Sequence, residues 1–184
     1  IYFAYLFLQK LGIKNVKVAI NTIGSIAGRA RYEEALKEYF SKHIENMCDD
    51  CKTRLEKNPL RILDCKNEDC KKITAKAPNI LDYLCDDCKN HFEAVKNHLI
   101  AAGIPFTVNP KIVRGLDYYC HTVFELEVDV PEFGAQNVIG AGGRYDKLVS
   151  DLGGPKTPGV GMAFGLERLL LASELCGKPL AKAD

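Results

Sequence analysis

The stretch from Phe124 to Val130 alternates without exception between apolar and acidic residues. Its apolar members are Phe124, Leu126, Val128 and Val130, and its acidic members are Glu125, Glu127 and Asp129. This two-residue period is typical of a strand that buries one face and leaves the other polar. The chain therefore needs a sheet around this strand and an apolar layer against one side of it.

Other segments supply the neighbouring strands. Val16, Val18 and Ile20 alternate in the same way. The stretch 137–141 predicts a partner strand, reached through a turn at Gly134, and a further glycine-rich strand precedes Gly165. Glycines at 140, 142 and 143 interrupt the partner strand, which indicates a bulge or a close approach of something to its backbone.

Four segments carry apolar residues at helical spacing, and they span 1–11, 32–44, 92–102 and 165–175. Ser25 is placed to cap the second helix, and Gly103 ends the third as a left-handed residue would. The predicted fold class is α+β, with an antiparallel sheet flanked by helices.

The composition changes between about Met47 and Cys88, where six cysteines and many Lys and Asp replace the long apolar runs. This change predicts a mainly helical, Cys-rich insertion. The expected organisation is a strand-and-helix segment over 1–46, the insertion over 47–88, and a second sheet segment over 89–184.

The insertion holds three cysteine pairs, Cys48-x2-Cys51, Cys65-x4-Cys70 and Cys85-x2-Cys88. Two such pairs suffice for a tetrahedral structural Zn²⁺ site, and a small insertion gains much stability from one. Our predicted ligands are Cys48, Cys51, Cys85 and Cys88. Cys65 is expected to be a small buried apolar residue, and Cys120 and Cys176 to be packing residues. Reduced thiols without metal remain the alternative.

The bulk charge gives no argument for binding a polyanion over a wide surface. Lys and Arg number 25 against 24 Asp and Glu, for a net charge of +1, so we expect most of the binding surface for any RNA partner to lie elsewhere. The apolar run that opens the chain at Ile1, without a Met, is too short to span a bilayer and lacks the flanks of a signal peptide. We expect a cytoplasmic fragment of a longer protein.

Three segments carry candidate site residues. The stretch 113–119 offers Arg114, Asp117, Tyr118 and Tyr119, and 141–146 offers paired glycines with Arg144 and Tyr145. The stretch 158–170 is a glycine-rich strand followed by Arg168 in the first turn of a helix. A permanent cation beside phenols suits a small zwitterionic ligand, and Arg suits a phosphate. Each segment alone also fits ordinary core aromatics, a plain turn or packing glycines.

Together, the order and spacing of these segments resemble histidyl-tRNA synthetase, a class II aminoacyl-tRNA synthetase. Residues 114–125 and 142–146 are similar to its two histidine-specific motifs, and 158–170 to the third class II motif. The resemblance extends over Asn21–Ser25, Asn58–Arg61 and Leu63–Lys66. Cys120-His121 departs from the usual pattern, and we expect an exposed His121 at a strand start.

The resemblance implies a ligase that joins histidine to ATP, with Mg²⁺, and passes the histidyl group to histidine tRNA. Arg114 would be catalytic, contacting the α-phosphate and the histidine carboxylate. Histidine would be held by Arg114, Tyr118, Tyr119, Tyr145 and Gly142. ATP would be held by Arg114, Gly165 and Arg168. Members of the family act as homodimers.

Parts that the family needs have no match here, namely the first two class II motifs and the anticodon-binding domain. We therefore expect the isolated chain to be inactive. Two other readings stay open. One is a non-catalytic synthetase-like regulatory subunit of histidine biosynthesis, and the other is a zinc-ribbon binding module.

Overall fold

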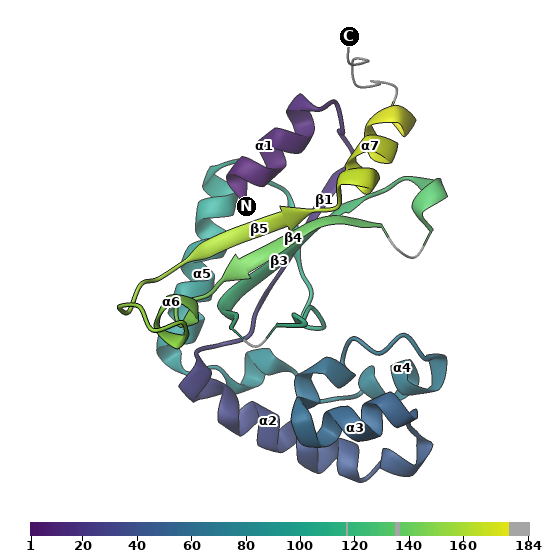
Figure 1. Ribbon diagram of the computed structural model, residues 1–184, viewed down its shortest axis with the longest axis vertical. Coiled ribbons are helices and arrows are strands. Elements are labelled where there is room, and N and C mark those ends of the chain that lie inside the picture. The colour runs from purple at the N-terminus through teal and green to yellow at the C-terminus, as the bar shows by residue number, and fades with distance from the viewer. Residues whose placement is uncertain (117, 135–136, 177–184) are drawn as a thin grey trace.

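Five strands form a single sheet in the order β2-β1-β3-β4-β5 (Figure 1). The computed structural model describes residues 1–116, 118–134 and 137–176. The strands are β1 (Val16–Thr22), β2 (Phe106–Val108), β3 (Cys120–Val128), β4 (Val138–Arg144) and β5 (Val160–Phe164). Neighbours pair antiparallel, as predicted, except that the short edge strand β2 runs parallel to β1.

One face of the sheet is buried under three helices, α1 (Tyr2–Lys10), α5 (Asp86–Ala101) and α7 (Leu166–Leu175). The alternation in β3 places Phe124, Leu126 and Val128 on this face, and the β1 register sets Ile20 opposite Phe124 and Val18 opposite Leu126. Each such side chain gains about 1.5–3 kcal/mol on full burial. This layer is the main hydrophobic core.

The opposite face of the same strands carries a smaller hydrophobic cluster, on the side away from α1, α5 and α7. Ala19 and Val123 are buried there with Ile23, Ile112 and Tyr119. The segment that follows β2 contributes Ile112, Tyr118 and Tyr119 to this cluster. These residues therefore lie against the sheet on that same side.

A helical unit gathers below the sheet in Figure 1. It comprises α2 (Ile26–Ser41), η1 (Ile44–Asn46), α3 (Asp49–Lys57), η2 (Pro59–Ile62), α4 (Glu68–Thr74) and η3 (Ile80–Tyr83). Its core joins Tyr32, Leu36 and Phe40 of α2 to the Cys-rich segment. Helix α2 thus packs with the insertion, and the boundaries 47–88 stay a prediction.

Several local signals act as expected. The Ser25 side chain accepts a hydrogen bond from the Gly28 amide and caps α2. Gly103, at φ +66°, follows α5, and Gly134, at φ +53°, follows η4 (Pro131–Phe133) before β4 begins. The remaining helix, α6, is the single turn Leu148–Asp151. Among the described residues, no helix has the length and apolarity to cross a membrane.

The glycines of β4 let strands and rings approach closely. A Cβ on Gly142 would meet the Gly161 carbonyl oxygen on β5, and it would lie 2.8 Å from the Phe124 ring and 2.9 Å from Met162 Cα. Two of these three obstacles are backbone atoms, which cannot swing away. Glycine at this position is therefore a requirement of strand packing.

We expect Gly142→Ala to destabilise the chain by about 1–3 kcal/mol, because the added methyl forces β4 and β5 apart. Urea unfolding followed by circular dichroism measures the effect. Gly115→Ala is the matched control, since its Cβ would have no atom within 4 Å. Equal midpoints for the two variants would contradict this account of the β4–β5 contact.

Candidate active site

Three tyrosines from two segments meet on the open face of the sheet. The ring centroids of Tyr118 and Tyr119 lie 4.7 Å apart, and the Tyr145 ring stands nearly perpendicular to both, at 5.7 and 6.1 Å. Edge-to-face contacts of this kind hold rings in fixed orientations. The structure therefore brings together the aromatic residues of the first two candidate segments. Asp117, which the sequence placed beside them, lies outside the described residues.

Arg114 joins this aromatic cluster. Its guanidinium carbon lies 5.5 Å from the centroid of the Tyr119 ring, and its Nη1 lies 3.4 Å from Glu125 Oε1. The side chain is 23% exposed, and its buried Nε has no hydrogen-bond partner within the described part of the chain. A half-buried guanidinium with donors still to satisfy is suited to a carboxylate or phosphate ligand.

Glu125 is the acidic partner of Arg114 on β3. Its side chain is 23% exposed. Burial raises the pKa of the Glu125 carboxyl, and the positive charge of Arg114 opposes that rise. The sequence analysis placed Glu125 in an alternating strand and at the end of the motif-like stretch 114–125, without giving it a role in the site. Its pairing with a residue eleven positions earlier could not be read from that pattern.

Buried hydrogen bonds fix the backbone of the Arg114 loop. The Asn21 amide of β1 donates to the carbonyl oxygens of Pro110 and Ile112, at 3.2 and 2.9 Å. The buried Arg29 of α2 donates to the Tyr119 carbonyl at 2.6 Å and to the Ile23 carbonyl at 3.2 Å. Asn21 and Arg29 thus hold the backbone on either side of Arg114 in place. No local pattern in the sequence indicates the role of Arg29.

Glycines line the floor of the aromatic cluster. A Cβ on Gly143 would lie 2.8 Å from the Tyr119 ring, and one on Gly159 would lie 2.5 Å from the Tyr145 ring. We predicted Gly142 as a histidine contact. A Cβ on Gly142 would point toward Phe124, on the helix-covered face of the sheet. Because side chains alternate along a strand, the glycine that approaches the tyrosines is its neighbour Gly143.

A charged pair and two imidazoles lie next to Tyr145. Arg144 Nε donates to both carboxylate oxygens of Asp146, at 2.8 and 2.9 Å. The rings of His91 and His121 lie 4.9 Å apart. Burial is the largest cause that lowers the pKa of His121, and His91 and Arg144 lower it further. The expectation of an exposed His121 was wrong, because it packs against α5 at a left-handed φ of 51°.

Arg168 and Gly165 lie at the other end of β4 and β5. Arg168 lies in the first turn of α7 and donates from Nη1 to the Val138 carbonyl at 3.3 Å. Tyr145 follows the opposite end of β4, and the seven residues Val138–Arg144 separate the two places. At about 3.3 Å per residue this is roughly 20 Å along the strand. The structure therefore does not bring Arg168 into the aromatic cluster.

The cysteines group differently from the prediction. The sulfurs of Cys48, Cys51, Cys65 and Cys70 all lie within 4.8 Å of one another. Cys85 and Cys88 are not part of this group, and Cys88 Sγ instead accepts from the Ser25 amide at 3.3 Å. The third pair follows η3 and opens α5, so the chain path separates it from the first pair. Cys65, expected only to fill space, is buried beside the other three sulfurs.

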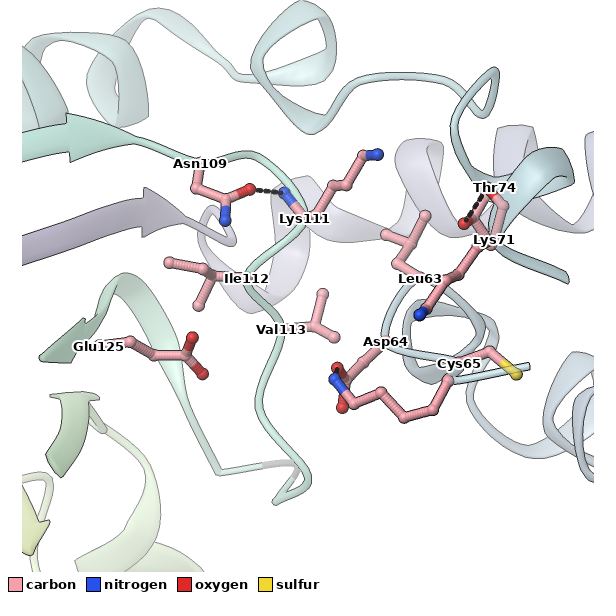
Figure 2. A pocket seen from close by; sticks show the side chains of 11 residues that line it. Leu63, Asp64, Cys65, Lys71, Thr74, Asn109, Lys111, Ile112, Val113 and Glu125 are labelled. Atoms are coloured by element: carbon pink, nitrogen blue, oxygen red, sulfur yellow. Dashed lines mark hydrogen bonds and ion pairs between the residues drawn. The ribbon is translucent and has the colours of Figure 1, made fainter. Parts of the chain in front are cut away.

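A cavity of about 310 Å³ lies between the helical unit and the sheet (Figure 2). Asp64 and Cys65 border it on one side, and Ile112, Val113 and Glu125 border it on the other. Val113 also packs against the core of the helical unit. The residue beside Arg114 is thus in contact with the Cys-rich segment.

Comparison with known proteins decides the family. The family model described as histidyl-tRNA synthetase matches residues 10–169. The chain belongs to the histidyl-tRNA synthetase family. It is 49% identical over 181 residues to the histidine–tRNA ligase of Caldanaerobacter subterraneus, covering 98% of this chain and 43% of that protein. For the ligase of Halothermothrix orenii the identity is 50% over 177 residues, with 96% and 42% covered.

The fold agrees with a solved member of the family. The apo histidyl-tRNA synthetase of S. aureus superposes with a TM-score of 0.76 at 41% identity, over 96% of this chain and 43% of that one. The chain thus spans about two fifths of the length of the relatives it matches. The resemblance read from the sequence motifs is confirmed at the level of family and fold.

Glu125→Gln should change the pH dependence of stability in a defined direction. Because burial raises the pKa of the Glu125 carboxyl, the folded chain holds this proton more tightly than the unfolded chain does. Its contribution to stability is therefore present below the ordinary pKa of Glu and is lost as pH rises through the raised value. Relative to wild type, the variant should therefore gain stability as pH rises above the ordinary pKa of Glu and through the raised pKa of Glu125.

Urea unfolding at a series of pH values measures this difference. The exposed Glu132 provides the control variant, Glu132→Gln, which should follow wild type throughout. Parallel profiles for wild type and the Glu125 variant would show that the carboxyl titrates alike in the folded and unfolded chains.

Proposed function

We propose that this chain carries the histidine-binding part of an active site that joins histidine to ATP and then passes the histidyl group to histidine tRNA. The observation that supports this most is the meeting of Arg114, Tyr118, Tyr119 and Tyr145 on one face of the sheet. The cluster supplies one cation and three phenols to a space bounded by strand glycines. This combination suits a zwitterionic amino acid with a polar ring.

In the proposed first step, a carboxylate oxygen of histidine attacks the α-phosphorus of ATP, and the bond to the bridging oxygen of pyrophosphate breaks. Negative charge gathers on the α-phosphate oxygens during the attack. Arg114 would donate from its guanidinium to those oxygens and to the histidine carboxylate, stabilising the transition state. Glu125 and the face of Tyr119 would hold the guanidinium in place, so that little reorganisation is needed.

Tyr119 and Tyr145 would bind the imidazole ring, with their hydroxyls donating to or accepting from its nitrogens. Tyr118 would complete the aromatic wall. Gly143 would take the close-approach role that we first gave to Gly142, because it faces the tyrosines. The Mg²⁺ that accompanies ATP would neutralise charge on the departing pyrophosphate.

Arg168 and Gly165 would serve the nucleotide at the far end of β4 and β5. The proposed arrangement places the adenine on Gly165 and the γ-phosphate on Arg168. Because a Cβ on Gly165 would lie only 3.4 Å from Arg168 Cδ, ATP would have to bend so that its adenine and γ-phosphate come close together. Arg168 and Tyr145 lie at opposite ends of β4, about 20 Å apart along the strand, so ATP and histidine together would have to span that distance. Histidine tRNA, a homodimeric assembly and a cytoplasmic location complete the proposal.

The presence of the pocket residues favours a catalytic protein over a non-catalytic regulatory relative. A regulatory subunit has no need of Arg114, Tyr118, Tyr119 and Arg168 together. A zinc-ribbon binding module would likewise give no reason for an arginine packed on a tyrosine across the sheet from the main core. Histidine activation therefore accounts for more of the described side chains than either alternative.

A segment exchange tests the proposal directly. This chain would replace the matched region of the C. subterraneus ligase, with which it shares 49% identity. We expect the chimera to catalyse histidine-dependent ATP–pyrophosphate exchange, and Arg114→Ala to lower its rate about 100-fold or more. Arg31→Ala, a change at an exposed arginine of α2, is the control and should leave the rate unchanged.

An exchange rate that Arg114→Ala does not lower in the folded chimera would refute the role of Arg114. Binding of a histidyl-adenylate analogue by calorimetry separates the two steps. The Arg114 variant should lose affinity for the analogue more than for histidine alone, because only the analogue carries the α-phosphate.

The 184-residue chain by itself should show no histidine-dependent exchange. The family's second class II motif supplies another arginine to the α-phosphate, and the chain has no match to it. Robust exchange by the purified chain would contradict this expectation. The assay needs the intact chimera beside it as a positive control.

A further inference from the structure

The four-sulfur group of the helical unit draws its members from three separate elements. Cys48 is the N-cap of α3 and Cys51 lies in its first turn, Cys65 follows η2, and Cys70 lies in α4. All four are free thiols, and three of them are buried. Their sulfurs lie within 4.8 Å of one another. Segments that are far apart in sequence thus converge on one small volume.

The spacing of the sulfurs fits a metal-centred tetrahedron. With Zn–S bonds of about 2.3 Å, the sulfurs of a tetrahedral site are about 3.8 Å apart. Cys48 Sγ and Cys65 Sγ lie 3.8 Å apart in the structure. The Cys48 amide also donates to Cys70 Sγ at 3.3 Å. Such N–H···S bonds favour thiolate over thiol, and thiolate is the form that binds metal.

We propose that Cys48, Cys51, Cys65 and Cys70 bind one Zn²⁺ ion as a tetrahedral four-thiolate centre that holds the helical unit together. Four soft sulfur ligands select zinc over magnesium or calcium, and a site with four protein ligands leaves no open position for catalysis. The ion is therefore structural. This inference does not rest on the proposed function.

The helical unit has a physical need for such a centre. Helices α3 and α4 are nine and seven residues long, and helices this short are marginal in isolation. Between them the chain forms the single 3-10 helix η2. One ion bound by both helices and by the residue after η2 replaces apolar mass that this segment lacks.

The other metal-like groups of the described residues lack these features. Cys120, His121 and Asp146 lie within 4.8 Å of one another, but both Asp146 oxygens already accept from Arg144. Cys85 and Cys88 form a pair without further ligands in the group. Among the described residues, the four-cysteine group is therefore the better candidate, because none of its four sulfurs is paired with a charged side chain.

The centre would also shape one wall of the candidate active site. Cys65 directly follows Asp64, and both border the cavity shared with Glu125. Asp64 lies beside Arg114 as well, in a smaller hollow that Arg61 and Val113 complete. Ligation of Cys65 thus fixes the backbone that faces the Arg114 loop. Loss of the ion should loosen that wall first.

The test is metal analysis of the reduced, purified 184-residue chain. Inductively coupled plasma mass spectrometry should find one equivalent of zinc in the wild-type chain. We expect the zinc to be lost in Cys51→Ser and in Cys70→Ser. The double variant Cys85→Ser/Cys88→Ser is the matched control and should keep the metal. Zinc retained in the first two variants, or lost only in the control, would overturn the assignment.

Cobalt substitution guards against variants that fail to fold. Co²⁺ added to the metal-free wild-type chain should give the intense visible bands of a tetrahedral site and thiolate-to-cobalt charge transfer. Cys70→His should keep the metal and shift those bands, because histidine is also a ligand. A metal-free wild-type chain that binds no Co²⁺ while its four cysteines react as thiols, or are joined in disulfides, would refute the proposal.

Discussion

Burial of one face of β3 against α1, α5 and α7 determines where every other part of the chain lies. The alternation that places Phe124, Leu126 and Val128 in the core also places Val123 and Glu125 on the opposite side. A slip of one residue would exchange the two faces and put the carboxylate of Glu125 into the core. The position of Arg114 against Tyr119 and Glu125 depends on that register.

Much of this fold is present in local sequence patterns. Period-two alternation located β1 and β3, helical spacing located α1, α2, α5 and α7, and Ser25 and Gly103 marked helix ends. The short edge strand β2 was missed because three residues are too few to show a period. Helix α2 was located, but its packing on the Cys-rich segment depends on contacts that no local pattern specifies.

The candidate site was predictable in its residues and not in its partners. Arg114, Tyr118, Tyr119 and Tyr145 gather as their motifs suggested. Arg29 contacts a carbonyl ninety residues away, so no local pattern indicates it. Glu125 lies within the motif-like stretch 114–125, but its ion pair with Arg114 depends on how the loop folds back on β3. Whether Gly142 or Gly143 approaches the tyrosines depends on which face of β4 each residue occupies. Which cysteines lie together depends on how the segments between the helices fold back on one another. From their spacing, the two CxxC pairs were the predicted ligands. In the structure, Cys65 and Cys70 lie beside Cys48 and Cys51 in place of Cys85 and Cys88.

Arg29 has a mechanical consequence. Its guanidinium is anchored in α2, whose far end is packed into the helical unit, while its donors grip the backbone at Ile23 and Tyr119. A rigid-body tilt of that unit would act as a lever on the phenol-bearing loop. The backbone that carries Tyr119 and the helix that carries Arg29 are thus mechanically connected through one buried guanidinium.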